Sequence, residues 1–183
     1  GRSRYLARDV IRDLEFENYI VCNGSAAFLS HNQVFKHLLD ANELDRLVTT
    51  ANQQGIDTAF IEMDRARRLT SNNVGAMAQA MMSFGAGVPE VDDQFPEDQE
   101  GYQALAFFGA EYQGQFEAAF PLFRFVRWHE NCVDVVPQNG SKAATIQFLA
   151  ERVGIAPQDI IAFGDGNNDK EMLSQAGVGV AMG

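Results

Sequence analysis

The sequence predicts an α/β protein, a doubly wound parallel core interrupted by an inserted α+β domain. Near both ends of the chain, short apolar runs alternate with amphipathic segments, the pattern of a parallel sheet with crossover helices. The middle of the chain instead mixes helical segments with hairpin-like strands. We therefore expect residues 1–25 and 135–183 to form the core and residues 26–134 to form the inserted domain.

The first half of the chain predicts alternating helices and strands. Apolar residues recur three or four positions apart in the expected helices, whereas short apolar runs beside turn residues mark the strands. The expected helices cover residues 3–16, 34–51 and 73–84, and the expected strands cover residues 19–22 and 58–63. Asn23-Gly24 closes the first strand as a turn. Residues 88–101 are acidic and contain two prolines, so a loop is expected there.

The second half predicts more strands. The expected strands cover residues 103–108, 122–128, 132–136, 160–163 and 178–182, and the expected helices cover residues 110–119, 141–153 and 169–176. Pro121 ends the first of these helices and Gly154 closes the second. His129-Glu130-Asn131 separates two strands, which predicts a hairpin. The continuous apolar run Ile160–Phe163 is typical of a strand buried on both faces.

The composition indicates a folded protein with an acidic surface. Lys plus Arg number 14 and Asp plus Glu number 25, which gives a net charge of −11. Basic residues are scattered, apart from Arg65, Arg67 and Arg68, so we expect no nucleic-acid partner. No apolar run approaches the roughly 18 residues of a membrane span, and no secretory signal is seen, so we expect a cytoplasmic protein without a membrane partner. Cys22 and Cys132 lie alone on apolar runs and are expected to be reduced core residues.

The strongest chemical signal is the segment Gly164-Asp165-Gly166-Asn167-Asn168-Asp169, which follows an expected strand and opens an expected helix. Ligands of open α/β sheets bind at the carboxyl ends of the strands, and a helix start is a ready anion site. Carboxylate and amide oxygens are hard ligands suited to Mg²⁺. The alternative is a loop in which an Asn or Asp only caps the helix.

Other segments carry weaker signals. Lys142, at the start of an expected helix, opposes the helix dipole by about 0.3–1 kcal/mol, so it is either exposed or compensated by an anion. Asn23-Gly24 is either a plain turn or an amide placed at the carboxyl edge of the sheet. Trp128-His129 either lines a substrate pocket or forms only the tip of the hairpin. The three histidines have no metal-site spacing.

Taken in chain order, these segments resemble the haloacid dehalogenase (HAD) superfamily, in its Cof-like branch with a large α+β (C2-type) cap. Gly1-Arg2 resembles the end of a Ser/Thr-Gly-Arg turn, and Asn23-Gly24 resembles the strand end that precedes the cap. Lys142 matches the lysine of the third family motif. Gly164–Asp169, continued by Met172-Leu173, resembles the motif GDGxNDxxML and is the specific part of the likeness.

The resemblance implies both a fold and a chemistry. Residues 1–25 and 135–183 would form an incomplete Rossmann-like core that lacks its first strand, and residues 26–134 would form the cap. The implied activity is that of a Mg²⁺-dependent phosphatase, which acts on a small phosphorylated metabolite through an aspartyl-phosphate intermediate.

The resemblance also assigns roles to single residues. Asp165 is implied as a Mg²⁺ ligand. Asp169 is implied either as a second Mg²⁺ ligand or as a carboxylate that contacts the ligands without touching the ion. Lys142 is implied to neutralise the phosphate, and with the two aspartates it makes up the implied catalytic set. The residues implied at the phosphate are Gly1, Arg2, Asn23, Lys142 and Asn168.

The sequence departs from the family at its first motif. No Asp-x-Asp-Gly-Thr segment, which carries the nucleophile and the general acid/base in the family, occurs in these 183 residues. Both ends of the chain also resemble cuts through structure. The resemblance therefore implies that this chain alone does not hydrolyse phosphate esters. Without a central strand it is also expected to be prone to aggregation or poorly folded.

Two other functions stay open on the sequence. One is a non-catalytic, ligand-binding member of the same family. The other is the phosphorylation domain of a P-type cation pump, which has a similar GDGxND turn but fits less well, because the insert is short and no membrane span is present. For the phosphatase, a sugar phosphate is the first substrate expected, followed by pyridoxal phosphate or flavin mononucleotide.

Overall fold

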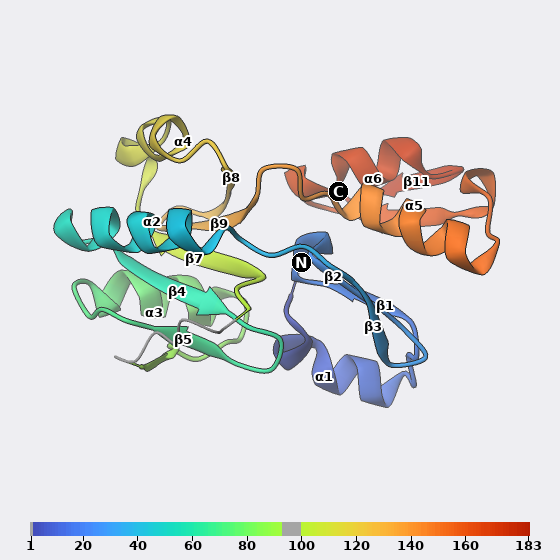
Figure 1. Ribbon diagram of the computed structural model, residues 1–183, viewed down its shortest axis with the longest axis horizontal. Coiled ribbons are helices and arrows are strands. Elements are labelled where there is room, and N and C mark those ends of the chain that lie inside the picture. The colour runs from blue at the N-terminus through green and yellow to red at the C-terminus, as the bar shows by residue number, and fades with distance from the viewer. Residues whose placement is uncertain (1, 93–99) are drawn as a thin grey trace.

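The computed structural model describes residues 2–92 and 100–183, which fold into a mixed α/β chain with three separate sheets (Figure 1). The α/β fold class expected from the sequence is confirmed. In this view the largest sheet lies on one side of the molecule, and the two smaller sheets lie on the other.

The largest sheet has the strand order β6-β5-β4-β7-β9-β8. Its strands are β4 (Asp57–Ile61), β5 (Ala66–Arg68), β6 (Glu90–Val91), β7 (Gln103–Phe107), β8 (Phe123–His129) and β9 (Cys132–Pro137). All neighbouring strands run antiparallel except β5 and β6. The expected hairpin is confirmed, because β8 pairs with β9.

Helices cover both faces of this sheet, because alternate residues of each strand point to opposite sides. Ala104 and Ala106 of β7 pack in a cluster with α2 (Ala41–Gln53) and α4 (Gln115–Ala119). Leu105 of β7 instead packs with α3 (Val74–Ser83). The face of the sheet toward α3 also carries the candidate site.

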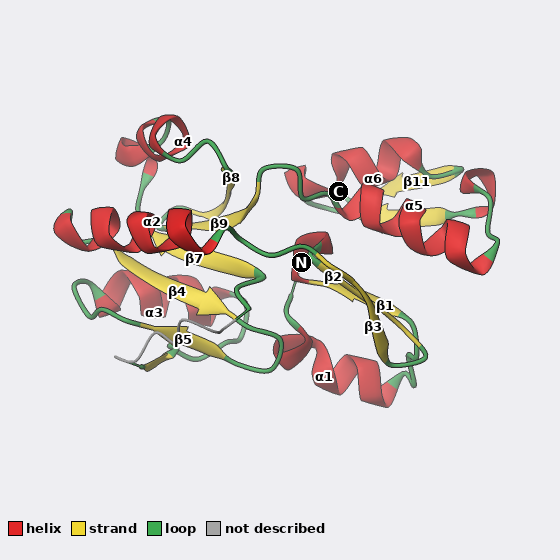
Figure 2. Cartoon of the chain, viewed as in Figure 1, coloured by secondary structure: helices red, strands yellow, loops and turns green. Residues whose placement is uncertain are grey.

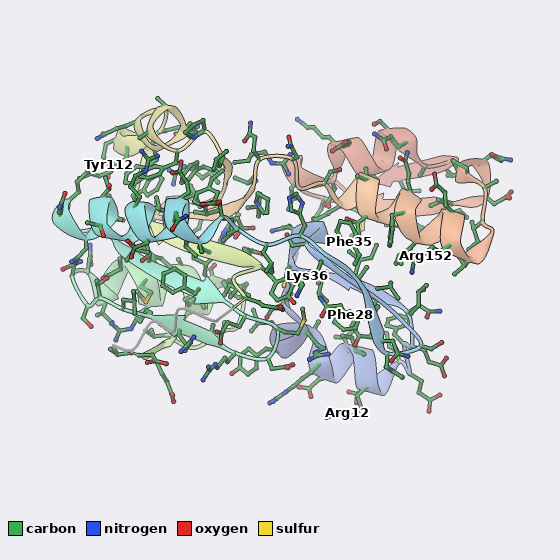
Figure 3. The ribbon with its side chains drawn as sticks, in the orientation of Figure 1. Arg12, Phe28, Phe35, Lys36, Tyr112 and Arg152 are labelled. Carbon is green, nitrogen blue, oxygen red and sulfur yellow. The ribbon has the colours of Figure 1, made fainter. Side chains whose placement is uncertain are left out.

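A three-stranded antiparallel sheet contains β1 (Tyr19–Val21), β2 (Ala26–Leu29) and β3 (Asn32–Lys36). It lies between α1 (Arg4–Asp13) and α5 (Lys142–Val153) (Figure 1). The Arg4 guanidinium lies 5.1 Å from the centre of the Phe28 ring, and the Phe35 and Phe148 rings lie 5.1 Å apart. Figure 3 labels Phe28 and Phe35 on this sheet. This sheet crosses residue 25, where the sequence predicts that the core gives way to the insert. The division into core and cap stays a prediction.

The third sheet is a parallel pair of β10 (Ile161–Gly164) and β11 (Val178–Ala181). The helix α6 (Lys170–Gln175) contacts both strands, and α5 packs against α6. Ile161 and Phe163 are each 62% exposed. The expectation that this strand is buried on both faces is therefore wrong, because in the described part of the chain helices cover only one face of the pair.

Two expected helices differ from the structure. Residues 34–51 form the end of β3 and then α2 (Figure 2). The helix begins after Asp40 because the Asp40 carboxylate accepts a hydrogen bond from the Glu43 N–H at 2.9 Å. Residues 110–119 split into a 3₁₀ turn, η2 (Ala110–Tyr112), and α4, because Gly114 between them has φ +86°. Among the strands, β2, β3, β5 and β6 were not expected. Part of the expected loop at residues 88–101 lies outside the described residues.

Local residues also set the ends of other helices, including the expected end of α5 at Gly154. The side chains of Ser3, Asn73 and Ser141 cap the starts of α1, α3 and α5. Gly154 ends α5 in the left-handed conformation. The remaining 3₁₀ turns are η1 (Cys22–Gly24), η3 (Pro157–Asp159) and η4 (Asn167–Asp169). Across the described ranges, the helices are too short or too polar to cross a membrane.

Both cysteines are free and fully buried, as expected. Burial raises the pKa of Cys22 to about 12 and raises that of Cys132 well above its ordinary value. Both side chains therefore stay protonated at neutral pH, which indicates packing rather than nucleophilic chemistry.

Candidate active site

The first part of the site is the turn η1 after β1. Asn23 has φ +54° and is buried, with only 7% of its surface exposed. Its amide nitrogen donates hydrogen bonds to Asp134 Oδ2 at 2.8 Å and to Gln103 Oε1 at 3.2 Å. The turn therefore points its amide into the space between the small sheet and the large one, and Asn23 is more than a plain turn residue.

The start of α5 packs directly on this turn. Gly24 has φ +95°, and a Cβ atom there would lie 2.8 Å from the Ser141 carbonyl oxygen and 2.9 Å from the Lys142 nitrogen. The Thr145 hydroxyl donates a hydrogen bond to the Gly24 carbonyl at 2.7 Å. This close approach places the first turn of α5, with Lys142, beside Asn23.

The segment after β10 supplies the acidic residues. Lys142 Nζ lies 2.6 Å from Asp169 Oδ1, and both side chains are mostly buried. Asp169 Oδ2 accepts hydrogen bonds from the N–H groups of Asp165, at 3.3 Å, and Gly166, at 3.1 Å. The unfavourable position of Lys142 at a helix start is thus compensated by the Asp169 carboxylate.

The environment of Asp169 favours its ionised form. Burial acts to raise the pKa of Asp169, but the Lys142 ammonium and the two backbone donors outweigh burial, so the pKa lies below its ordinary value. Asp169 is therefore a permanent anion at neutral pH that holds Lys142 in place.

A chain of hydrogen bonds runs from this segment to the large sheet. The Asn168 amide nitrogen donates to Asn23 Oδ1 at 3.1 Å, and the Asn23 amide nitrogen donates to Asp134. Burial raises the pKa of Asp134 above its ordinary value, although the hydrogen bond from Asn23 acts in the opposite direction. The chain Asn168–Asn23–Asp134 connects all three sheets, because its members follow β10, follow β1 and lie in β9.

Two cavities adjoin the hydrogen-bonded residues Asn168, Asn23 and Asp134. The smaller one, of about 70 Å³, is lined by Asn23, Arg124, Val126, Val136, Lys142, Asn168 and Glu171. It brings together two cationic side chains, Arg124 and Lys142, and two amides, which are groups that bind phosphate oxygens. The larger one, of about 170 Å³, also includes Asn168 in its wall, together with Asp134 and Trp128.

The structure brings together most of the residues predicted from the sequence. Asn23, Lys142, Asn168 and Asp169 contact one another in the pairs described above. Arg2 lines the larger cavity, and its carbonyl accepts a hydrogen bond from the Cys22 N–H at 2.8 Å. Gly1 lies outside the described residues.

Asp165 differs from the other predicted residues because it is exposed. Within residues 2–92 and 100–183 its carboxylate makes no hydrogen bond or ion pair, so it is available to a ligand. Of the pair Trp128-His129, Trp128 lines the larger cavity, whereas His129 Nδ1 accepts a hydrogen bond from the Asn131 N–H at 3.1 Å within the hairpin.

The sequence interpretation missed Asp134, Gln103 and Arg124. Asp134 did carry a signal, because it is a single carboxyl within the apolar run of residues 132–136. A charged residue inside a buried strand needs a partner or a function. Gln103 and Arg124 carried no such signal.

The acidic residues fit a Mg²⁺ ion only in part. Magnesium binds oxygen ligands and is often held by one or two carboxylates together with waters and substrate phosphates. Asp165 offers a free carboxylate, whereas both oxygens of Asp169 already accept hydrogen bonds. In the part of the chain that the structure describes, no three His, Cys, Asp or Glu side chains lie close enough to form a metal site by themselves. The donor set thus fits an ion held by Asp165 with other ligands.

Comparison with known proteins gives consistent matches over the whole chain. The family model for haloacid dehalogenase-like hydrolases matches residues 1–183. The Bacillus subtilis (strain 168) protein named "Putative phosphatase YkrA" is 34% identical over 183 residues, which cover 100% of this chain and 70% of that protein.

Solved structures agree with this match. A protein from Geobacillus kaustophilus HTA426 superposes with a TM-score of 0.90 at 35% identity, covering 100% of this chain and 71% of that one. A HAD phosphatase from Bacteroides thetaiotaomicron superposes with a TM-score of 0.87, covering 100% of this chain and 68% of that one. At 24% identity, the second match supports the fold alone.

Proposed function

Because the chain belongs to the haloacid dehalogenase-like hydrolases, we propose that it provides the metal-side residues and the cap of a Mg²⁺-dependent phosphatase for a small phosphorylated metabolite. The observation that carries the proposal is the Lys142–Asp169 pair beside the Asn23–Asn168 contact, at the edge of a small cavity. The similarity to a relative named as a phosphatase supports it.

In this proposal the phosphoryl group occupies the smaller cavity. Lys142 neutralises its charge, and the second N–H of the Asn168 amide donates a hydrogen bond to one of its oxygens, while Asn23 holds Asn168 in place. Asp169 is a positioning residue, because its carboxylate holds the Lys142 ammonium while its second oxygen fixes the turn after β10. Preorganised charge of this kind is the main contribution of proteins to phosphoryl transfer.

Asp165 is the residue that would hold Mg²⁺, and the ion would stabilise negative charge on the phosphoryl oxygens. The attacking carboxylate, which would form the aspartyl phosphate, is assigned to an Asp-x-Asp-Gly-Thr segment that these 183 residues do not contain. The chain alone is therefore expected not to turn over phosphate esters.

The test is phosphate release from a panel of sugar phosphates, pyridoxal phosphate and flavin mononucleotide by the full-length product of the gene. We expect hydrolysis that requires Mg²⁺ and is abolished by EDTA. Asp165→Asn and Lys142→Met should each reduce kcat about 100-fold or more, because each removes charge stabilisation of the transition state. Asp45→Asn, an exposed change on α2, serves as the matched control.

Two outcomes would contradict the proposal. A folded full-length protein that hydrolyses none of these esters, yet binds one of them, would instead indicate the non-catalytic family member. Mg²⁺-dependent hydrolysis by the purified 183-residue chain would refute the assignment of the nucleophile to another segment.

A further inference from the structure

The smaller cavity takes one of its walls from the large sheet. Arg124 and Val126 lie two residues apart on β8 and therefore point to the same face of the sheet. Val136 of β9 pairs with Arg124 across the hairpin and completes the wall. The two valines offer only apolar surface, so Arg124 is the polar group that the described part of the sheet contributes to the cavity.

The segment that leads into α5 holds Arg124 in place. Arg124 Nη2 donates a hydrogen bond at 2.6 Å to the carbonyl of Gly140, two residues before Lys142. A guanidinium has five N–H donors, so this bond leaves most of them without an acceptor. Across the described residues, the buried Nε makes no hydrogen bond, and the guanidinium forms no ion pair. A partly buried cation without an anionic partner is costly, so the side chain has capacity for an anion.

The other charges at the cavity make this capacity significant. The positive charge of Lys142 is already offset by Asp169. Glu171 also lines the cavity and adds a negative charge, and its Oε2 accepts a hydrogen bond from Ser141 Oγ at 2.7 Å. Among the described residues that line the cavity, Arg124 is therefore the cation that no carboxylate offsets. Without Arg124, the two carboxylates would repel an incoming dianion.

The size of the cavity limits the group that Arg124 meets there. Its volume is about 70 Å³. An apolar cavity of about 150 Å³ is known to accept one benzene molecule, so this cavity is too small for a ring. A compact anion such as a phosphoryl group matches this volume better than a sugar or an aromatic ring does.

We propose that Arg124 is a further phosphoryl-binding residue, whose guanidinium donates hydrogen bonds to the oxygens of the group that is transferred. The assignment rests on the phosphatase function proposed above, which puts that group in this cavity. The planar fork of a guanidinium binds two phosphate oxygens at once, which a lysine ammonium cannot do. The phosphoryl group is then held from two elements, by Arg124 on the edge strand β8 and by Lys142 on α5.

Binding of inorganic phosphate to the full-length product of the gene tests the assignment. The titration is followed by calorimetry in the presence of Mg²⁺. Arg124→Gln should weaken phosphate binding about tenfold or more, because hydrogen bonds between charged groups are lost. Arg124→Lys keeps the charge without the fork and should recover part of the binding. Arg12→Gln removes the same charge at an exposed position on α1 and should leave binding unchanged (Figure 3).

A second measurement needs no variant. In a crystal of the unchanged full-length protein grown with phosphate, a phosphate oxygen should lie about 2.7–2.9 Å from a nitrogen of Arg124. A phosphate that contacts Lys142 but stays farther than about 3.5 Å from the guanidinium would overturn the assignment. This result would decide the matter even if every Arg124 variant failed to fold.

The remaining outcomes separate this assignment from the phosphatase function. Phosphate binding that Arg124→Gln leaves unaltered, or weakens no more than Arg12→Gln does, would overturn the role of Arg124 even if the ester panel shows hydrolysis. Failure of the unchanged protein to bind phosphate would overturn it as well. Binding that depends on Arg124, without hydrolysis of any ester, would remove the phosphatase and keep Arg124 as a phosphate-binding residue.

Discussion

At the residue scale, Asp134 is a carboxyl buried inside a strand. It lies within β9 between Val133 and Val135, both of which are buried, and only 8% of its own surface is exposed. Because burial raises its pKa, the folded protein binds a proton at Asp134 more readily than the unfolded chain does. The stability that Asp134 contributes is present below its ordinary pKa of about 4 and is lost as the pH rises through its higher pKa in the folded state.

Asp134→Asn should therefore stabilise the fold at pH 7. The amide can still accept the hydrogen bond from Asn23, and it carries no charge to bury. The melting temperature of the variant should exceed that of the original chain by about 2–4 °C for each kcal/mol gained. Calorimetry between pH 3 and pH 7 checks this, and the difference should shrink toward zero at the acid end. A variant that is less stable at pH 7 would contradict the prediction.

Part of the site could be predicted from the sequence. The motif around Asp165 and Asp169 and the lysine at Lys142 were found because they resemble family motifs, and the structure pairs Lys142 with Asp169. Asp134 and Gln103 were missed, because their role depends on which face of β9 and β7 turns toward α3. That register is fixed by pairing between strands far apart in the sequence, which local patterns do not contain.

At the element scale, the site depends on the docking of α5 onto the turn η1. Both Gly24 and Gly85 have positive φ, but a Cβ atom at Gly24 would clash with the backbone of Ser141 and Lys142, whereas at Gly85 it would meet open space. An alanine at Gly85 would therefore cost only the free energy of a left-handed backbone. An alanine at Gly24 would also cost the free energy of separating α5 from η1.

Gly85→Ala should cost about 1–2 kcal/mol, the price of a left-handed conformation for alanine. Gly24→Ala should cost clearly more, because α5 must also move away from η1, and it should displace Lys142 from Asn23. Urea unfolding measures both costs, and amide chemical shifts of Asn23 and Lys142 report the displacement. Equal costs for the two variants would show that the contact does not constrain α5.

Helices with strong end signals were predicted well, such as α5 between Ser141 and Gly154. The errors lie where local signals compete. Residues 34–36 are compatible with a helix by apolar spacing, but they pair with β2, and Phe35 packs against Phe148 of α5. Such pairing outweighs local helical preference, which amounts to less than about 1 kcal/mol for each ordinary residue.

At the scale of the whole molecule, one face of the β10–β11 pair is open to solvent. Parallel strands are almost always covered on both faces. Ile161 and Phe163 on β10, Val178 on β11 and Met182 after it are all more than half exposed. Large exposed apolar patches of this kind favour association with other surfaces.

Phe163→Lys should therefore reduce self-association of the chain. Covering a phenylalanine side chain contributes about 1.5–3 kcal/mol, so its loss should weaken association at least about tenfold. Leu122→Lys, at an exposed apolar position outside this pair, is the matched control. Sedimentation velocity over a range of concentrations measures the effect, together with binding of a hydrophobic dye. A chain that stays monomeric at every concentration would contradict the prediction.

The hydrogen bond from the Thr145 hydroxyl to the Gly24 carbonyl joins residues 121 positions apart in the chain. The β8–β9 hairpin and the β10–α6–β11 unit, by contrast, are built from residues close in sequence. Closing a long loop costs more entropy than closing a short one, so we expect the local units to form early in folding and the Thr145–Gly24 contact to form after the main barrier. Changes at this contact should then act mainly on the unfolding rate, so that the corner between η1 and α5 is the last part to assemble and the first to open.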